Sequence, residues 1–314
     1  MATTEQYLTQ LQLDKQNLIN NLAEMGVEVT GNETFTSLAP KVFDVQASGG
    51  DEELEASFIS SIDSTLGKNV TKLPNGLTSI GDQAFRGCTN LALTSLPNSI
   101  TTLGEYSFYT CKNLKLNELP NGLTKIGNYA FYQCENLKLT KLPTSLTTLG
   151  NYAFYFCSNL AFTSLPEGIK TIPQYCFHTC SFLPLSSLPS GLTSIQSGAF
   201  YRCTKLAITE IPSGVTVLNS SVFDSCTSLT EITCQGAMTA INASCFTGCS
   251  NLAKLVFPNV TSVPSLNNVN ALNNTAIAKG NGYIYFPDSL AETAKGMTNW
   301  STYASQIKGL SELW

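Results

Sequence analysis

Eleven cysteines are the residues in this sequence that could most readily do chemistry, because thiols form disulfides and bind zinc. A zinc site needs ligands that converge through short local spacings, and the sequence contains no Cys-x-x-Cys pair. Eight of the cysteines instead recur at intervals of 23 residues: Cys88, Cys111, Cys134, Cys157, Cys180, Cys203, Cys226 and Cys249. Stacked turns would lie close enough for disulfides, but buried free thiols that fill one repeated pocket explain a uniform column more simply. We therefore expect no metal, no cofactor and no disulfide framework.

The only histidine, His178, limits acid–base and nucleophilic chemistry to one place in the chain. It follows a repeated phenylalanine directly, in a position that other repeats fill with tyrosine. No column of acidic residues faces another, and no phosphate-binding glycine loop is present. We therefore interpret His178 as a substitution in an aromatic column and predict that the protein is not an enzyme.

Tyrosines are the best candidates for binding a ligand. The candidate ligand-binding residues are expected to stack in register on one surface: Tyr109, Tyr132, Tyr155, His178 and Tyr201. A second tyrosine column lies two residues before each phenylalanine: Tyr106, Tyr129, Tyr152 and Tyr175. Regularly spaced rings suit sugar rings or a protein partner, because they offer contact area at a low entropy cost. The same rings could equally shield the edge of the fold by stacking on each other.

These side chains depend on a 23-residue repeat for their positions. Phenylalanine recurs at this interval as Phe85, Phe108, Phe131, Phe154, Phe177, Phe200, Phe223 and Phe246. A cysteine follows each phenylalanine by three residues, a leucine follows by six, and an aliphatic residue precedes by five. One turn of this length cannot close its own core, whereas stacked turns bury these side chains as continuous ladders. Residues 66–264 are therefore predicted to form eight turns of a solenoid.

Each repeat is predicted to contain a strand, a second extended piece and a helical turn. In one repeat, Leu91 to Leu96 is the expected strand, which Pro97 ends because proline cannot donate to a ladder. Residues 100–104 are the expected extended piece, and residues 105–111 an α-helical or 3₁₀ turn. A repeated glycine indicates a residue with positive φ: Gly81, Gly104, Gly127 and Gly150. In the last two repeats the inward residues shift, so we expect a change of strand register there.

Segments outside the repeat are predicted to cap or connect the solenoid. Residues 1–48 begin with a helix that docks or oligomerises, residues 49–65 form a linker and N-terminal cap, and residues 265–314 form an α/β C-terminal cap. That cap is expected to hold a strand at residues 283–287 and a helix with a Ser289–Glu292 capping box. The first helix carries apolar residues at heptad spacing: Leu8, Leu11, Leu18, Leu22 and Met25. This stripe either packs on the first repeat or forms a coiled coil with other copies.

Charge and hydropathy exclude several classes of partner. The net charge is −5, and no cluster of Lys and Arg could follow a phosphate backbone, so we do not expect nucleic acid binding. No run of apolar residues is long enough to cross a bilayer, so we expect no membrane span. The segment from Met1 to Asp14 does not resemble a secretory signal, which predicts synthesis and folding in a reducing cytoplasm.

The repeat resembles the BspA-like (Treponema-type) leucine-rich repeats over residues 66–264. The residues that carry the resemblance are LPNGLTSIGDQAFRGCTNL, LPNGLTKIGNYAFYQCENL and LPTSLTTLGNYAFYFCSNL. This resemblance implies a right-handed leucine-rich-repeat solenoid with a sheet on one face. It also implies adhesion, or binding of proteins or glycans, on bacterial and protozoan surfaces.

The flanks resemble a second class of protein. KQNLINNLAEMGVEVTGNETFTSLAPKVFDV is similar to a segment of tail-associated structural proteins of phages and prophages, and YIYFPDSLAETAKGMTNWSTYASQIKGLSEL is similar to a cap that closes such arrays. This resemblance implies a virion component that contacts other virion proteins or itself and recognises a host-surface glycan or protein. The alternative hypothesis is a bacterial surface adhesin or protein-interaction module.

Overall fold

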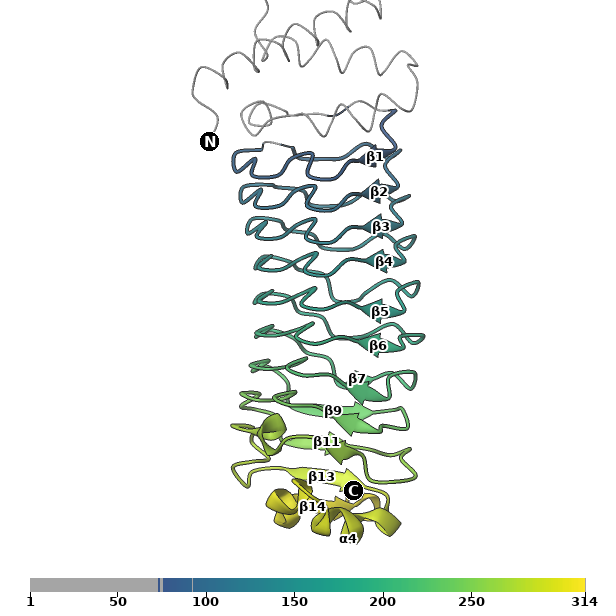
Figure 1. Cartoon of the computed structure of the whole chain (residues 1–314), viewed down its shortest axis with the longest axis vertical. Helices are drawn as coiled ribbons and strands as arrows, with labels where there is room; N and C mark the ends of the chain where they lie inside the picture. The colour runs from purple at the N-terminus through teal and green to yellow at the C-terminus, as the bar shows by residue number, and fades with distance from the viewer. Residues whose placement is uncertain (1–72, 74–75, 92, 314) are drawn as a thin grey trace, which may run out of the picture.

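The protein forms a solenoid whose turns stack along one long axis (Figure 1). The structure is a computed structural model that describes residues 73, 76–91 and 93–313. The predicted solenoid is confirmed. The N-terminal predictions lie outside the described residues, namely the segments at 1–48 and 49–65 with Leu8, Leu11, Leu18, Leu22 and Met25. Those segments and the boundary at residue 264 stay predictions.

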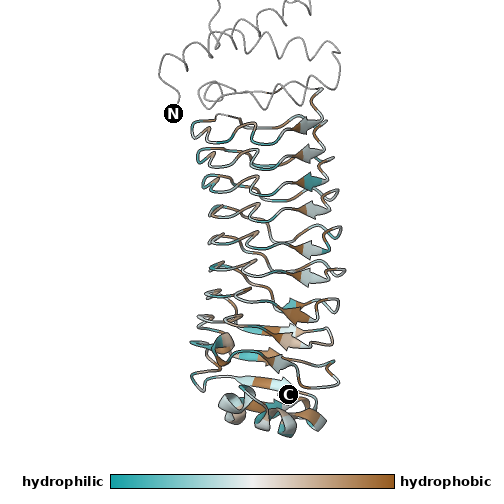
Figure 2. Ribbon diagram, viewed as in Figure 1, coloured by the Kyte–Doolittle hydropathy of each residue, from teal (hydrophilic) through white to brown (hydrophobic). Residues whose placement is uncertain are grey.

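Short parallel strands hold neighbouring turns together. The strands of the first six turns have two residues each, of which the second is buried: β1 (Ser79–Ile80), β2 (Thr102–Leu103), β3 (Lys125–Ile126), β4 (Thr148–Leu149), β5 (Thr171–Ile172) and β6 (Ser194–Ile195). Paired residues occupy equivalent positions in successive repeats, as Thr102 and Lys125 do. Figure 2 shows a polar and an apolar residue side by side within the stacked strands.

The strands do not lie where the sequence pattern placed them in the first turns. Residues 93–97 are not a strand, and the ladder forms in the second extended piece instead. The pre-proline segment becomes a strand only in later turns: β7 (Glu210–Ile211), β9 (Glu231–Cys234) and β11 (Lys254–Val256). The longest, β9, occurs where Gln235 replaces the repeated proline and its N–H donates to the Ile211 carbonyl at 2.9 Å. Loss of the proline therefore lets the ladder extend.

The predicted change of strand register is wrong. Glu210 pairs with Thr233 and Glu231 pairs with Lys254, so the offset between partners is still one repeat. The buried position shifts by one residue. Ile208 is buried in the preceding repeat, whereas its equivalent Glu231 is partly exposed and the following Ile232 is buried.

On the other side of the solenoid, proline interrupts the sheet at one turn, that of Pro173. The amide N–H of Gly104 donates to the Ile80 carbonyl and that of Gly127 to the Leu103 carbonyl, both at 2.8 Å. Pro173 occupies the equivalent position and has no N–H, so β4 and β5 belong to different sheets. The sheet resumes after a second break as β8 (Val217–Leu218), β10 (Ala240–Ile241) and β12 (Ser265–Leu266).

The repeated glycines are needed for close approach of neighbouring turns, and the prediction of positive φ at these positions is wrong. A Cβ on Gly127 would lie 2.6 Å from the carbonyl carbon of Gly104, closer than real Cβ atoms approach backbone. Positive φ occurs two residues later, at Tyr106 (56°) and Tyr129 (56°). The sequence pattern thus identified a position that requires glycine, but the reason is close backbone approach and not positive φ.

Residues 105–111 form consecutive turns, and the predicted helical turn is absent. The N–H of Tyr109 donates to the Tyr106 carbonyl at 3.1 Å, and that of Cys111 donates to the Phe108 carbonyl at 3.0 Å. Between these bonds, the Phe108 N–H donates to Ala130 of the next turn at 2.8 Å. A helix would direct these N–H groups along its own axis, whereas here alternate groups join one turn to the next.

Buried leucine, isoleucine, phenylalanine and cysteine side chains from each turn form the core, in which phenylalanine and cysteine make two continuous columns. Phe85 and Phe108 stack with ring centroids 5.3 Å apart, and the column continues to Phe246. The Cys111 thiol donates to the Phe85 carbonyl of the preceding turn at 2.9 Å, and the six following members of the cysteine column repeat this bond. All eleven cysteines are buried, and the ten from Cys111 to Cys249 are free thiols. Cysteine fits this column because it is small and apolar yet supplies a donor to a buried carbonyl.

The C-terminal end is closed by a compact α/β cap. Its elements are η2 (Val269–Leu272), β13 (Tyr283–Phe286), α4 (Asp288–Gly296), η3 (Trp300–Gln306), β14 (Ile307–Gly309) and η4 (Leu310–Glu312). The predicted strand at 283–287 is confirmed as β13, which pairs with β11 and β14. Trp300 is fully buried, and its indole N–H donates to the Pro264 carbonyl at 2.7 Å.

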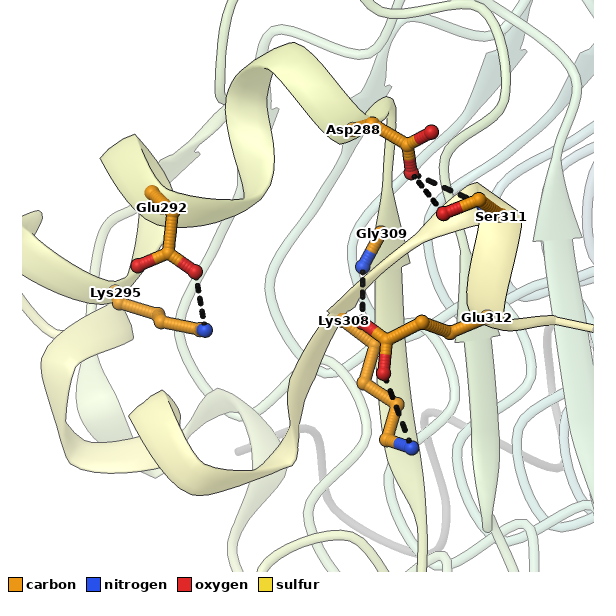
Figure 3. Close-up of polar contacts among 7 residues, drawn as sticks. All are labelled: Asp288, Glu292, Lys295, Lys308, Gly309, Ser311 and Glu312. Carbon is orange, nitrogen blue, oxygen red and sulfur yellow. Dashed lines mark hydrogen bonds and ion pairs between the residues drawn. The ribbon is translucent and has the colours of Figure 1, made fainter.

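Polar side chains fix the last strand of the cap, as Figure 3 shows. Asp288 accepts hydrogen bonds from the backbone and hydroxyl of Ser311, both at 3.0 Å. Glu312 accepts from the Gly309 N–H at 3.1 Å, so a side chain satisfies part of the exposed edge of β14. The predicted capping box is wrong, because α4 begins at Asp288 without a side-chain cap and Glu292 pairs with Lys295 at 2.6 Å.

Candidate functional site

The five candidate ligand-binding residues form one continuous stack. Centroids of successive rings lie 4.8, 4.6, 4.3 and 4.6 Å apart, with interplanar angles of 3–17°, in the order Tyr109, Tyr132, Tyr155, His178 and Tyr201. Each ring is partly exposed. We call this set the first column.

A second column runs beside the first. Tyr106, Tyr129 and Tyr152 stack at 4.7 Å, and Tyr175 continues the column at 5.1 Å. Rings of the two columns meet at tilted angles, as for Tyr129 and Tyr132, whose centroids are 5.8 Å apart at 49°. We call the two columns together the aromatic stripe.

The second column stands on a strained backbone. Its four tyrosines have φ of 52–57°, in the left-handed region that favours glycine. That conformation costs a non-glycine residue roughly 1–2 kcal/mol. Stacking of aromatic rings contributes about 0.5–1.5 kcal/mol per pair, which is large enough to offset most of that cost. The equivalent Gln83, Ser221 and Ser244 have the same positive φ without a ring, so the conformation belongs to the repeat and stacking adds a local stabilisation where tyrosine is present.

Cations and a glycine end the stripe. The Arg86 guanidinium lies 5.5 Å from the centroid of Tyr106 and 5.4 Å from that of Tyr109, at one end. At the other end, Arg202 lies 5.2 Å from the centroid of Tyr201. The second column stops at Gly198, where φ is 64° and a Cβ would collide with the Tyr175 ring.

This arrangement leaves ring edges and hydroxyl groups, but few ring faces, open to a ligand. Interior rings are covered on both faces by their neighbours in the column. Burial raises the pKa of Tyr132 and of Tyr129, and neighbouring tyrosines raise both further. The hydroxyl groups therefore stay protonated and can donate hydrogen bonds at neutral pH.

His178 has no partner of the kind that a catalytic base needs. Burial lowers the pKa of His178 to about 4, and the positive charge of Arg202 contributes to this shift. The ring is therefore neutral at pH 7, and its Nδ1 lies 2.9 Å from the hydroxyl of Thr179. No carboxylate hydrogen bond orients the ring within the described part of the chain, unlike the arrangement in a Ser-His-Asp triad.

The cysteines cannot serve as ready nucleophiles. Burial raises the pKa of the Cys134 and Cys180 thiols well above the ordinary value, with a smaller contribution from neighbouring thiols. The reactive form of cysteine is the thiolate, so these groups are inert at neutral pH. Across residues 73, 76–91 and 93–313, no group of three or more His, Cys, Asp or Glu side chains is arranged to hold a metal ion.

Sequence reasoning missed two exposed phenylalanines, of which Phe156 lies beside the stripe. Phe156 is 36% exposed, and its centroid lies 5.0 Å from that of Tyr155 and 5.9 Å from that of His178. Phe182 is 61% exposed. The signal was available, because Phe182 replaces an asparagine that recurs at Asn90, Asn113, Asn136 and Asn159.

No helix in the described part of the chain is both long and apolar enough to cross a membrane.

Comparison with known proteins identifies the repeat. A model of the BspA type leucine rich repeat region matches in six copies, over residues 64–184 and 147–272. No curated protein sequence matches the chain. The match to the repeat model covers most of the solenoid.

Several solved structures are similar to this chain. A leucine rich repeat protein of T. pallidum is 29% identical, with a TM-score of 0.40, over 60% of this chain and 79% of that one. A leucine rich cell surface protein of Faecalibacterium prausnitzii is 19% identical, with a TM-score of 0.37, over 76% and 83%. A leucine-rich repeat protein of Bacteroides ovatus is 18% identical, with a TM-score of 0.28, over 74% and 87%.

Proposed function

The chain belongs to the BspA-type leucine-rich repeat family, and from that premise we propose that it is a non-catalytic binding protein that recognises a protein partner at a bacterial surface. The observation that carries the proposal is the aromatic stripe, in which two adjacent columns of partly exposed rings lie on one flank of the solenoid. Tyrosine side chains supply large contact areas with little loss of conformational entropy, and they are enriched among residues that dominate protein interfaces.

A protein partner suits the stripe better than a neutral glycan does. Sugar rings pack against open faces of aromatic rings, and the faces of Tyr132 and Tyr155 are covered by their neighbours in the column. What remains is a row of ring edges and hydroxyl groups spaced about one strand apart. Side chains and backbone groups of a polypeptide can use such a row.

Several physical observations support a protein without catalytic activity. The leucine-rich repeat family and the solenoid fold are typically non-catalytic. The single histidine is neutral and stacked between two tyrosines, and burial keeps the thiols protonated. The Thr179 hydroxyl lies 2.9 Å from Nδ1 of that histidine, but no carboxylate hydrogen bond orients the ring among the described residues, so the third group of a triad is missing.

We do not extend the proposal to a virion component. That hypothesis depends on the resemblance of the two flanks, and the repeat model matches only residues 64–272, between them. Genes that flank this one would separate the two hypotheses, because tail genes would favour a virion and cell-wall anchoring genes would favour an adhesin.

A paired array tests the proposed function. The full chain and its Tyr132→Ser and Tyr155→Ser variants are applied in parallel to arrays of host extracellular proteins and of glycans. We expect binding to at least one protein, reduced about tenfold or more in each variant, because removal of a central interface tyrosine typically weakens binding by that amount. Tyr283→Ser, which removes an exposed ring of the C-terminal cap, is the matched control.

Two outcomes of the array contradict the proposal. Binding confined to glycans would show that the partner class is wrong. Binding to a protein that is equal for the wild-type chain and both stripe variants would show that the stripe is not the site.

A further inference from the structure

Departures from the repeat gather on one part of the surface, next to the stripe. Three large hydrophobic side chains are exposed among the described residues, namely Phe156, Phe182 and Tyr283. The first two lie in neighbouring turns. The same turns carry His178 in place of the column tyrosine. An exposed apolar cluster on an otherwise polar surface marks an interaction site more often than scattered apolar residues do.

Hydrogen bonds between turns place the two phenylalanines on adjoining segments. The Phe156 N–H donates to the His178 carbonyl at 2.8 Å, and the Phe182 N–H donates to the Ser158 carbonyl at 3.1 Å. Both bonds join the turn that contains Phe156 to the turn that contains Phe182. The backbone segments that carry the two exposed rings therefore adjoin, and the stripe borders Phe156 through Tyr155 and His178.

The next turn adds positive charge to this surface. Arg202 and Lys205 are exposed, and they occupy the positions that Thr179 and Phe182 hold in the preceding repeat, so each lies one turn further along the same column. Lys205 makes no ion pair with any described residue. Asp224 interacts electrostatically with Arg202 without forming an ion pair, and it is partly buried and accepts a hydrogen bond from the Ser225 hydroxyl at 2.7 Å. On a chain with a net charge of −5, this is a local surplus of positive charge.

Three neutral donors around the two phenylalanines are already used. The Ser158 hydroxyl and the Asn159 amide both donate to the Glu135 carbonyl, at 3.4 and 2.7 Å. The Thr204 hydroxyl donates to the Ser181 carbonyl at 3.0 Å. A neutral saccharide would therefore find few free donors here, whereas a carboxylate could bind the guanidinium of Arg202 and the ammonium of Lys205.

We propose that Phe156, Phe182, Arg202 and Lys205, which we call the aromatic–cationic patch, bind an acidic peptide segment that carries an apolar side chain. The apolar side chain packs between the exposed phenylalanines, and flanking Asp or Glu residues pair with the two cations. This inference rests on the proposed function, and it names the chemistry of the protein partner and the centre of its binding site.

Labelled synthetic peptides test the proposal on the full chain. Three short probes of equal length share one central Phe and one Leu and differ in their other positions, which are Asp and Glu, Ser and Gly, or Lys. Fluorescence anisotropy is expected to show binding of the acidic probe, at least tenfold weaker binding of the neutral probe and none of the basic probe. Raising the salt concentration from about 0.05 to about 0.5 M should weaken the acidic complex by about tenfold, because exposed ion pairs are screened.

Each substitution introduces the residue that stands at the equivalent position of another repeat, so that the fold is preserved. Phe182→Asn restores the asparagine column, Phe156→Gln copies Gln133, and Arg202→Gln copies the same residue. Each variant is expected to bind the acidic probe at least tenfold more weakly, with an unchanged thermal midpoint. Tyr283→Ser, which removes the one other exposed large hydrophobic ring among the described residues, should bind as the wild-type chain does.

The inference and the proposed function can fail separately. Equal affinity of the wild-type chain and Phe182→Asn for the acidic probe, a preference for the neutral or basic probe, or binding of a sulfated oligosaccharide instead of any peptide would overturn the inference. If the stripe variants still lose binding on the protein array, the proposed function stands without it. If the stripe variants lose nothing, the proposed function fails whatever the peptides show.

Discussion

His178 shows how the solenoid controls the chemistry of a single side chain. Burial and Arg202 lower its pKa to about 4, below the 6.5 of an unperturbed histidine. As the chain contains one histidine, its ring protons give a single titrating set of signals in an NMR spectrum. We expect the midpoint of that titration near pH 4, and a midpoint near 6.5 would contradict the burial seen in the structure.

The same shift predicts how stability depends on pH. The unfolded chain binds a proton at His178 below about pH 6.5 and the folded chain only near pH 4, so stability is lost as pH falls through this window. The effect should be on the order of 1 kcal/mol, less than the whole shift would give, because solvent screens a partly exposed ring. His178→Tyr restores the column residue, and the difference between its urea midpoint and that of the wild-type chain should grow from pH 7 to pH 4.

Single residues also show what the sequence could predict. The period placed every member of the first column correctly, because a constant spacing stacks equivalent residues whatever the local conformation. It could not predict that the second column has positive φ, since tyrosine is not a residue that this conformation favours. Phe182 was detectable as a departure from an asparagine column, but only the structure shows that its ring is exposed.

Neighbouring turns approach each other closely at the repeated glycine. A Cβ on Gly127 would lie 2.6 Å from the Gly104 carbonyl carbon and 2.7 Å from the Glu105 nitrogen, and neither backbone atom can yield easily. We expect Gly127→Ala to lower the free energy of unfolding by about 3 kcal/mol, as overpacking of a close interface does. Urea denaturation followed by circular dichroism measures this loss.

Gly122 provides a matched control in the same turn. A Cβ there would meet only the Asn98 carbonyl oxygen, at an ordinary 3.8 Å. Gly122→Ala should be neutral or stabilise the protein by about 0.5 kcal/mol, because alanine reduces the entropy of the unfolded chain. Equal effects of the two substitutions would mean that the turns are further apart than the structure places them.

Strand positions depend on backbone donors that a hydrophobic pattern does not report. Leucine spacing around Pro97 predicted a strand, yet the repeated proline removes one backbone N–H from each turn that carries it and limits pairing there. Gln235 restores that N–H and β9 lengthens, whereas Pro173 removes an N–H elsewhere and divides the sheet. The positions of the strands could have been predicted from the prolines, because each proline both ends a strand and lacks a backbone N–H for pairing.

On the scale of the whole molecule, each turn packs mainly on its two neighbours. Strand pairing, phenylalanine stacking and the cysteine bonds all join one repeat to the next. Stability in such a stack is approximately a sum of turns and interfaces, so damage at one end need not reach the middle. The period alone was sufficient to predict this architecture, but it contains no information on how the C-terminal end is closed.

Trp300 is the side chain that closes that end. It is fully buried, it meets Phe257 and Phe286 edge to face at 6.2 and 5.3 Å, and it donates to Pro264. We expect Trp300→Ala to destabilise the cap by about 3–5 kcal/mol, through a cavity and an unpaired carbonyl. Trp300→Phe keeps an aromatic ring and loses the hydrogen bond, so it should cost about 1–2 kcal/mol.

Amide hydrogen exchange measures which strands are destabilised by this substitution. Because coupling between turns passes only through neighbours, Trp300→Ala should raise the exchange rates of amides in β13 and β14 by at least a hundredfold. Amides of β2 and β3, many turns away, should keep their wild-type rates (Figure 1). An equal loss of protection in both regions would mean that the solenoid unfolds as one cooperative unit. In that case the cap would determine the stability of the aromatic stripe as well, and a partner bound there would stabilise the cap in return.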